Sequence, residues 1–317
     1  MNTPSRLASV SGPICLVTGG SSGIGLGTAQ ALSSVAQRIG LICRDERRGE
    51  AARDAIRRAN PAAAPIDVWV ADLASFASVR NIASSIRAAY SRVDVLVNNA
   101  GAVFSKRSIS EDGLEMHLAT NYAGHFLLTT LLIEELTRSK RPRVVSLTSS
   151  LHRLGRLRLD DLAFARPYHL VFSYAQSKLA GVVFTLELAR RARGTPILTH
   201  CVDPGFVRTG IYRGASGHQR WLARRCESFG RDPTDTGVLI ARIIAQAERQ
   251  GLSGRYWTPS GERPLARRAR DAATAEALWS KSLSWLSTAE SERLESALTG
   301  REMARGRYLS AGISTKS

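Results

Sequence analysis

The chain has 317 residues, of which 44% are hydrophobic, which is enough for one large core or two modest ones. Its 44 basic residues against 27 acidic ones give a formal net charge of +17. Because no apolar run reaches about 18 residues, we expect no transmembrane helix, and the apolar stretch 13–17 is too short for a secretory signal. These features predict a cytoplasmic protein, with residues 1–12 as a polar N-terminal extension.

The positive charge has two interpretations. The arginines are spread along the chain without a nucleic-acid-binding motif, so we expect no nucleic-acid partner. We interpret the excess as a solubility feature, with binding of an anionic ligand as the alternative. The four cysteines are scattered as reduced thiols, and the six histidines have no metal-ligand spacing, so we expect neither a disulfide framework nor a metal site.

The first predicted elements are a buried strand at 14–17, a glycine-rich turn and an apolar helix. Glycine permits the tight turn and lets the backbone approach a pyrophosphate, whose oxygens then accept from free N–H groups at the helix N-terminus. This order of elements predicts a dinucleotide site. Its expected contacts in the turn are Thr18, Gly19, Ser21, Ser22, Gly23, Ile24 and Gly25.

The second predicted strand, 39–43, ends in Cys43-Arg44. Enzymes that prefer NAD usually place an acidic side chain here to bind the ribose 2′-hydroxyl, which Cys43 cannot do. The Arg44 guanidinium instead suits a 2′-phosphate and favours NADP. The alternatives are that Arg44 is an ordinary surface arginine, or that it pairs with the adjacent Asp45.

Two further predicted strands, 66–70 and 93–97, also end in candidate cofactor contacts. Asp72, followed by Leu73, would either accept a hydrogen bond from adenine or cap the helix that begins near Ser75. The second strand runs into small residues that let the chain lie against a cofactor. Its candidate contacts are Asn98, Ala100 and Gly101.

The helical pattern 114–136 carries Asn121 in its middle. Asparagine is mildly unfavourable there, so we expect it either to cap a local backbone defect or to hold a water molecule. Predicted strands at 144–147 and 197–202 follow, and the latter leads to Pro204 and Gly205.

Strands and helices alternate over residues 13–287, which predicts an α/β fold. The expected architecture is a single-domain, doubly wound, parallel sheet of Rossmann type, with helices on both faces and ligands at the carboxyl ends of the strands. Residues 206–235 break the alternation and predict a substrate lid. Helices at 236–249 and 274–286 flank a last edge strand at 254–258, and residues 288–317 form a C-terminal helix and a mobile tail.

Tyr174 and Lys178 lie one turn apart at the start of another apolar helix. Residues at this spacing share one helix face, so both should point into the same cleft. The ammonium stabilises the phenolate and makes the tyrosine a usable proton donor and acceptor near neutral pH.

The ordered set of motifs resembles the short-chain dehydrogenase/reductase family over roughly residues 13–286. The set comprises the glycine turn, Asp72, Asn98-Asn99-Ala100-Gly101, Asn121, Ser149, Tyr174-x-x-x-Lys178 and Pro204-Gly205. A finer resemblance is to the retinol-dehydrogenase-like and WW-domain-oxidoreductase-like branch. It is carried by Cys43-Arg44-Asp45, by 121–129, by Ser149-x-x-His152, by 252–256 and by 275–279.

The resemblance implies an NADP-dependent enzyme that transfers a hydride between nicotinamide and an alcohol or carbonyl group. It implies Tyr174 as proton donor, Lys178 as the group that lowers its pKa and holds the ribose, and Ser149 as the oxyanion donor. Asn121 would hold a relay water. The spacing to His152 favours Ser149 over its neighbour Ser150. Segment 204–209 would flank the nicotinamide, through Pro204, Gly205, Val207 and Thr209.

The predicted substrate is a small apolar or aromatic molecule, such as a ketone, aldehyde, quinone or polyketide, and a lipid is equally allowed. Arginines in the 151–172 loop and in the lid favour an anionic group on it. The competing hypothesis is a non-catalytic NADP-binding regulatory or scaffold protein on the same fold. The expected assembly is a monomer or a homodimer.

Overall fold

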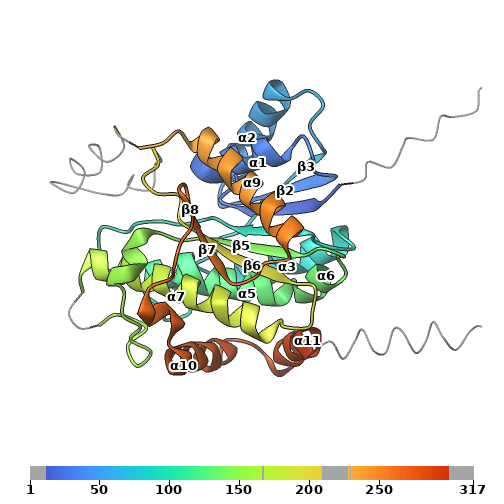
Figure 1. Ribbon diagram of the computed structural model, residues 1–317. Helices are drawn as coiled ribbons and strands as arrows, with labels where there is room; N and C mark the ends of the chain where they lie inside the picture. Colours follow the sequence, from blue (N-terminus) through green and yellow to red (C-terminus); the bar gives the residue numbers. More distant parts are fainter. Residues whose placement is uncertain (1–11, 166–167, 209–227, 229, 300–317) are drawn as a thin grey trace, which may run out of the picture.

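The computed structural model describes residues 12–165, 168–208, 228 and 230–299 (Figure 1). Within this part, the strands form one eight-stranded sheet in the order β3-β2-β1-β4-β5-β6-β7-β8, parallel except for β8. The predicted doubly wound parallel sheet is therefore confirmed. The strands are β1 Ile14–Thr18, β2 Arg38–Cys43, β3 Ile66–Val70, β4 Val95–Asn98, β5 Arg143–Leu147, β6 Leu198–Val202, β7 Arg255–Thr258 and β8 Gly261–Glu262.

The direction of winding reverses at β1, which pairs with β2 on one side and β4 on the other. Ligands of such sheets bind in the crevice outside the carboxyl ends of the strands at this switch point. The glycine turn after β1 and the small residues after β4 flank that crevice.

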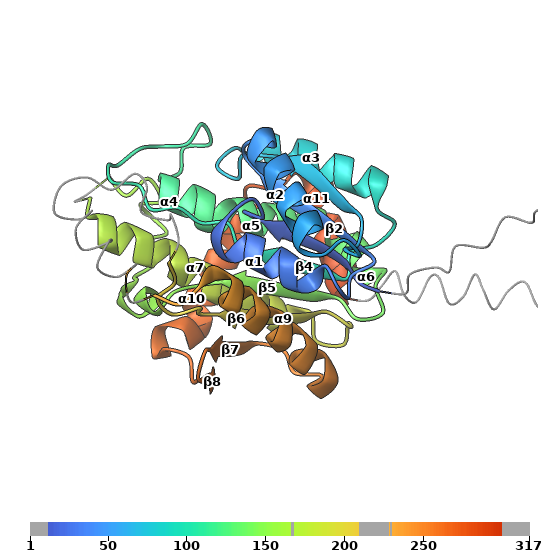
Figure 2. The same cartoon turned by 90° about the horizontal axis from the view of Figure 1, so that it is seen from above.

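Helices cover both faces of the sheet (Figures 1 and 2). One face carries α1 Gly23–Leu32, α2 Glu46–Ala59 and α9 Pro233–Gln250. The other face carries α3 Phe76–Ala89, α5 Gly124–Leu131, α6 Ile133–Thr137 and α7 Leu170–Arg191. Outside this second face lie α10 Ala272–Leu283 and α11 Thr288–Thr299, and α11 contributes Leu294, Ala297 and Leu298 to the same core.

The segment 114–136 is not the single helix that its apolar pattern predicts. It consists of α4 Met116–Leu118, a π-helical turn η1 Ala119–Ala123, α5 and α6. Asn121 lies in the π turn, and Gly124 follows that turn so close to the loop after β3 that an added Cβ would lie 2.2 Å from the Leu73 carbonyl oxygen. The predicted backbone defect at Asn121 is therefore real, and packing of Gly124 against the loop after β3 accompanies it.

Two other boundaries differ from expectation. Strand β7 is not the edge of the sheet, because β8 pairs antiparallel with it across a turn in which Gly261 has φ +98°. Helix α9 begins at Pro233, inside the stretch predicted as a lid, and residues 209–227 and 229 of that stretch lie outside the described residues. The predicted N-terminal extension and mobile tail also lie outside them, apart from Gly12 and residues 288–299.

The described helices include none whose length and apolar character would suit crossing a bilayer. Cys15, Cys43 and Cys201 are buried and unpaired, while Cys226 falls outside the described part of the chain.

Helices α1 and α9 pack backbone to backbone, and they lie side by side in Figures 1 and 2. A Cβ added at Gly27 would lie 2.4 Å from the Pro233 carbonyl oxygen. One added at Gly237 would lie 2.1 Å from the Gly27 carbonyl carbon. Only glycine fits at this crossing, which holds α9 beside the glycine turn.

We predict that Gly237→Ala lowers the free energy of unfolding by about 1–3 kcal/mol, because the methyl group forces the two helices apart. Gly181→Ala is the matched control, since Gly181 is also helical but an added Cβ would meet nothing within 4 Å. That change should be neutral or stabilise by up to about 1 kcal/mol. Urea denaturation followed by circular dichroism measures both, and equal stabilities of the two variants would contradict the close packing.

Candidate active site

Thr18 ties the end of β1 to the segment after β4. Its side chain is fully buried, and its Oγ1 accepts from the backbone N–H groups of Asn99 and Ala100, both at 2.9 Å. The same oxygen lies 2.9 Å from Nε2 of His125 on α5 and 3.3 Å from the Val97 carbonyl oxygen. Because its hydroxyl is used in this way, the Thr18 side chain positions the crevice walls rather than lining the crevice.

The glycine turn then enters α1 in a conformation that side chains would block. Gly19 and Gly23 have φ values of +66° and +55°, and a Cβ on Gly25 would lie 2.3 Å from the Gly19 carbonyl oxygen. The N-cap residue Ser22 makes no side-chain capping bond to α1. Backbone N–H groups at this helix end are therefore available to an anion, which fits the predicted pyrophosphate.

Arg44 is exposed at the end of β2, directly before α2. The carboxylate of Asp45 accepts from the Arg48 N–H at 2.9 Å and is the N-cap of α2. The alternative in which Asp45 pairs with Arg44 is thus not observed, and Arg44 keeps its guanidinium for another partner.

The alternative roles of Asp72 separate in the same way. Ser75, not Asp72, is the N-cap of α3, and its Oγ accepts from the Ser78 N–H. Asp72 is exposed, and its Oδ1 closes a turn by accepting from the Ala74 N–H at 2.9 Å. Leu73 is buried against α5, so its contribution to a site would come from its backbone.

The residues after β4 lie directly against the predicted catalytic pair. A Cβ added at Gly101 would lie 3.3 Å from Lys178 Nζ and 3.4 Å from Asn121 Oδ1. Asn98 is 2% exposed, and its amide donates to Thr129 Oγ1 at 3.0 Å. Its Oδ1 has no hydrogen-bond partner among the described residues.

Asn121 clamps three elements together. Its Oδ1 accepts from the Ala102 N–H at 2.8 Å, and its Nδ2 donates to the Ala102 carbonyl oxygen and to Ser177 Oγ, both at 3.1 Å. The π turn, the segment after β4 and helix α7 are therefore held in one geometry. Both N–H groups of the side chain and its Oδ1 have protein partners, which supports the capping role.

Tyr174 and Lys178 occupy the buried part of α7 at the crevice. Lys178 is 5% exposed; its Nζ donates to the Leu147 carbonyl oxygen at 3.2 Å and lies 5.7 Å from the Tyr174 ring centroid. Burial lowers the pKa of this amine to about 8, although the Asp203 carboxylate acts in the opposite direction. The pair thus combines a phenol with an ammonium that titrates near neutral pH.

The residues after β5 distinguish Ser149 from Ser150. Ser149 is half-buried and caps the 3₁₀ turn η2 Ser150–Leu154, with its Oγ accepting from the Leu151 N–H at 3.3 Å. Ser150 is exposed. The Ser149 carbonyl oxygen lies 2.7 Å from Nδ1 of His152, whose pKa is lowered chiefly by burial. Ser149 is therefore the more buried of the two serines, and its role as the oxyanion donor stays a prediction.

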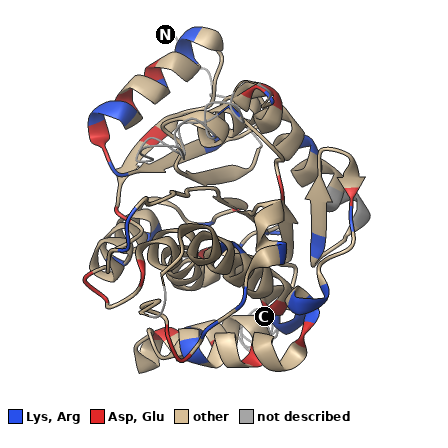
Figure 3. Cartoon of the chain, turned by 90° about the vertical axis from the view of Figure 1, so that its left-hand side faces the viewer, with Lys and Arg blue, Asp and Glu red and all other residues tan. Residues whose placement is uncertain are grey.

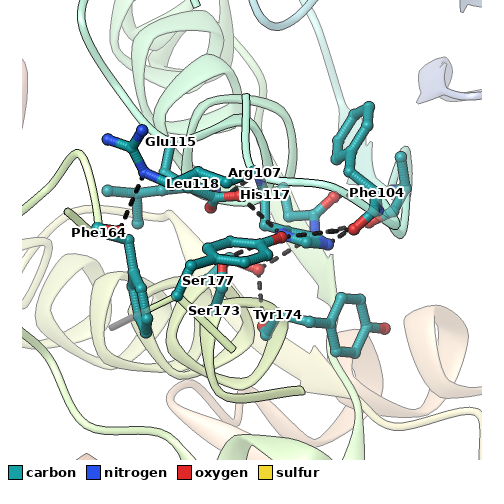
Figure 4. A network of polar contacts seen from close by, with 12 residues as sticks. Phe104, Arg107, Glu115, His117, Leu118, Phe164, Ser173, Tyr174 and Ser177 are labelled. Atoms are coloured by element: carbon teal, nitrogen blue, oxygen red, sulfur yellow. Dashed lines mark hydrogen bonds and ion pairs between the residues drawn. The ribbon is translucent and has the colours of Figure 1, made fainter. Parts of the chain in front are cut away.

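A buried pair, Glu115 and His117, supports the start of α7 and was missed by sequence reasoning (Figure 4). The ring of His117 is 0% exposed; its Nε2 accepts from the Phe104 N–H at 2.9 Å, and its Nδ1 lies 2.8 Å from Glu115 Oε1 and 3.0 Å from Ser173 Oγ. It packs edge-on against the Tyr174 ring at 5.9 Å. The spacing Glu-x-His at a helix start was the available signal.

The charge of Glu115 is stabilised inside the protein. Burial alone would raise its pKa, but hydrogen bonds from His117 and Ser173 outweigh burial and lower it. Glu115 also caps α4 by accepting from the His117 and Leu118 N–H groups. Figure 4 shows the Tyr174 hydroxyl directed away from this network, so the pair contacts the ring of Tyr174 and not its hydroxyl.

The segment after β6 contains buried Pro204 and Gly205 at φ +70°. Asp203 Oδ1 accepts from the Gly205 N–H at 2.9 Å, and half-buried Val207 forms a bridge with Arg231. Thr209, which was predicted to flank the nicotinamide, lies outside the described residues.

Comparison with known proteins agrees with this geometry. The short chain dehydrogenase family matches residues 13–219. Retinol dehydrogenase 12 of Bos taurus is 38% identical and covers 86% of this chain and 85% of its own length. Polyprenol dehydrogenase of Mus musculus is 35% identical, with 86% and 83% covered.

Solved structures agree as well. A crystal structure from Mycobacterium paratuberculosis has a TM-score of 0.68 at 32% identity and covers 89% of this chain and 96% of that one. A metagenomic short-chain oxidoreductase in complex with NADP shares the fold at a TM-score of 0.57 and 23% identity, with 78% and 96% covered. The chain therefore belongs to the short-chain dehydrogenase/reductase family, in its retinol-dehydrogenase-like branch.

Proposed function

We propose that the protein is an NADP-dependent oxidoreductase that interconverts an alcohol and a carbonyl group on a lipophilic or aromatic substrate. The observation that carries the proposal is the position of Tyr174 and Lys178, which lie on the buried part of α7 at the crevice, next to the segment after β4. Asn121 and Ser149 are also present, so the residue set offers nothing that favours the non-catalytic scaffold hypothesis.

The chain's own residues suit a dinucleotide. Its pyrophosphate would lie on the uncapped N-terminus of α1, where Gly19, Gly23 and Gly25 leave room for it. Arg44 would hold the 2′-phosphate, which is the reason for choosing NADP. Bound there, the nicotinamide supplies the hydride equivalent of the reaction.

The remaining steps concern protons at the substrate oxygen. In the direction of reduction, the Tyr174 phenol donates its proton to that oxygen, and the Ser149 hydroxyl donates a hydrogen bond to the developing charge. The Lys178 ammonium stabilises the phenolate that Tyr174 leaves behind. For oxidation the same groups act in reverse.

A water next to Lys178 would connect the pair to solvent. A cavity of about 10 Å³, close to the size of one water, is lined by Asn98, Asn121, His125 and Lys178 among others. The unpartnered Asn98 Oδ1 and the Lys178 amine supply an acceptor and a donor at this cavity. We assign the relay role to this cavity rather than to the Asn121 amide alone.

The substrate class follows from the relatives and the crevice mouth. Relatives of this chain are named for retinol and polyprenol, which are apolar alcohols. Phe206, which lies within the proposed cofactor segment 204–209, is 69% exposed and offers an apolar contact there. Arg153, Arg158 and Arg208, which are arginines of this region that the structure describes, leave an anionic group on the substrate compatible with the proposal.

The cellular setting is proposed as cytoplasmic. Three buried, unpaired cysteines support a reducing compartment. We expect the enzyme to act as a monomer or a homodimer.

We predict that Tyr174→Phe lowers kcat by about 10²–10⁴-fold, because it removes the proton donor while keeping the ring against His117. NADPH binding, followed by its fluorescence, should stay unchanged. The assay is NADPH oxidation with a panel of aromatic ketones, quinones and retinals. Turnover that persists in this variant on a substrate of the wild type contradicts the mechanism.

The pH dependence of kcat should reflect the protonation state of the Lys178 amine. Since burial lowers its pKa from 10.5 to about 8, the amine loses its charge as pH rises through about 8 and no longer stabilises the phenolate. We expect kcat for reduction to fall by about tenfold per pH unit above this value. Lys178→Arg keeps the charge at high pH and should move the limb upward, and an unmoved limb would exclude Lys178 as its source.

Cofactor preference should depend on Arg44. We predict that Arg44→Ala weakens NADPH binding by about tenfold or more and leaves NADH binding unchanged, because it removes a charged hydrogen-bond donor from the 2′-phosphate. Arg47→Ala, an exposed arginine in the first turn of α2, is the control with the same charge change. Equal effects of both variants, or a wild type that prefers NADH, would remove the argument for NADP.

A further inference from the structure

A second pocket lies away from the crevice, between the loop after η2, helix α7 and the start of α10. Its volume is about 730 Å³, which falls in the range of small-molecule sites, about 300–1,000 Å³. The residues that line it include none of the predicted catalytic or cofactor contacts. The proposed reaction therefore leaves this pocket without a role.

The rim of the pocket is strongly basic. It is lined by four exposed arginines, Arg156, Arg267, Arg268 and Arg270. Three of these, in the turn η4 Arg267–Arg270, form a largely blue segment beside the start of α10 in Figure 3. Arg268 donates to the Gly155 carbonyl oxygen at 3.4 Å, whereas the other three make no hydrogen bond or ion pair with the residues that the structure describes.

One carboxylate shares the rim but does not neutralise it. Asp271 Oδ2 accepts from the Thr274 N–H at 2.8 Å and is the N-cap of α10. One acidic group against four guanidinium groups leaves a net positive pocket. The N-terminus of this 12-residue helix adds a favourable field for an anion.

The floor of the pocket is apolar. Leu179, which is 2% exposed, and half-buried Leu157 line it and pack against the main core. A basic patch that serves only solubility needs no such floor. The combination instead fits a ligand with a short apolar body and an anionic end.

We propose that this pocket binds a phosphate-bearing ligand with an apolar body. A phosphate group carries about −1.5 to −2 charges and several acceptor oxygens, which match the forked donors of several arginines better than one carboxylate does. A soluble phosphate ester and the headgroup region of an anionic phospholipid share this chemistry. The pocket also gives part of the +17 net charge a specific role.

The pocket and the proposed active site share helix α7. Leu179 of the pocket directly follows Lys178 in the sequence. A Cβ added at Gly155 would lie 2.5 Å from the Ala175 carbonyl oxygen, so the end of η2 packs in close contact with α7. The proposal itself does not depend on the reaction, since its test measures binding.

The test uses the full chain saturated with NADPH, which fills the proposed dinucleotide site. Calorimetry measures binding of inorganic phosphate and of hexyl phosphate, and co-sedimentation measures binding to phosphatidylcholine vesicles with and without phosphatidic acid. The pocket variant is Arg267→Gln/Arg270→Gln. Its matched control, Arg57→Gln/Arg58→Gln, removes the same charge from exposed positions on α2, on the opposite side of the molecule from α10 (Figure 1).

We expect the wild type and the control to bind hexyl phosphate alike, and the pocket variant to bind it about tenfold or more weakly. Leu157→Ala should weaken hexyl phosphate and spare inorganic phosphate, because it removes only the apolar contact. Binding of phosphatidic acid vesicles that the pocket variant loses identifies a lipid headgroup as the source, and binding of hexyl phosphate alone identifies a soluble ester.

Three results would overturn the proposal. They are a wild type that binds neither hexyl phosphate nor phosphatidic acid vesicles, a pocket variant that binds like the wild type, and equal losses in the pocket and control variants. The last result would mean that only bulk charge attracts the phosphate. None of these results would contradict the proposed oxidoreductase activity, which the Tyr174→Phe assay tests separately.

Discussion

The Thr18 hydroxyl is the interaction on which the crevice depends. One buried oxygen receives the N–H groups of Asn99 and Ala100 and lies within hydrogen-bond distance of His125. A buried polar group without partners costs roughly 1–3 kcal/mol, so these contacts specify a single arrangement of the loops after β1 and β4. That arrangement fixes the positions of the glycine turn and of the crevice walls beside Lys178.

The burial of one face of helix α7 serves both the hydrophobic core and the proposed chemistry. Lys178 is buried because α7 packs closely on the sheet, and this burial lowers the pKa of its amine to about 8. A more exposed lysine would stay charged to higher pH but would stand in water, where its effect on Tyr174 is screened. Fold stability and proton chemistry therefore constrain the same residue, and one turn of α7 separates it from its tyrosine.

Much of the fold was predictable, because buried strands and glycine turns are local signals. The strand ends that form the crevice follow from short apolar runs that stop at polar or small residues. Asn121 was one signal of a backbone defect within 114–136, but the division into α4, a π turn, α5 and α6 was not predictable, because the apolar pattern continues while the hydrogen bonding shifts where Gly124 meets Leu73. The basic pocket was missed for a similar reason, since Arg156 and η4 are brought together only by the tertiary fold.

In the Glu115–His117 pair, a buried histidine next to the proposed catalytic tyrosine has a structural role and not an acid–base role. The Phe104 N–H donates to Nε2, so a neutral ring carries its proton on Nδ1 and directs it to the Glu115 carboxylate. Both nitrogens are thereby occupied inside the protein. His117 can contribute only by holding the edge of the Tyr174 ring and the start of α7, which fixes the direction in which the tyrosine offers its proton.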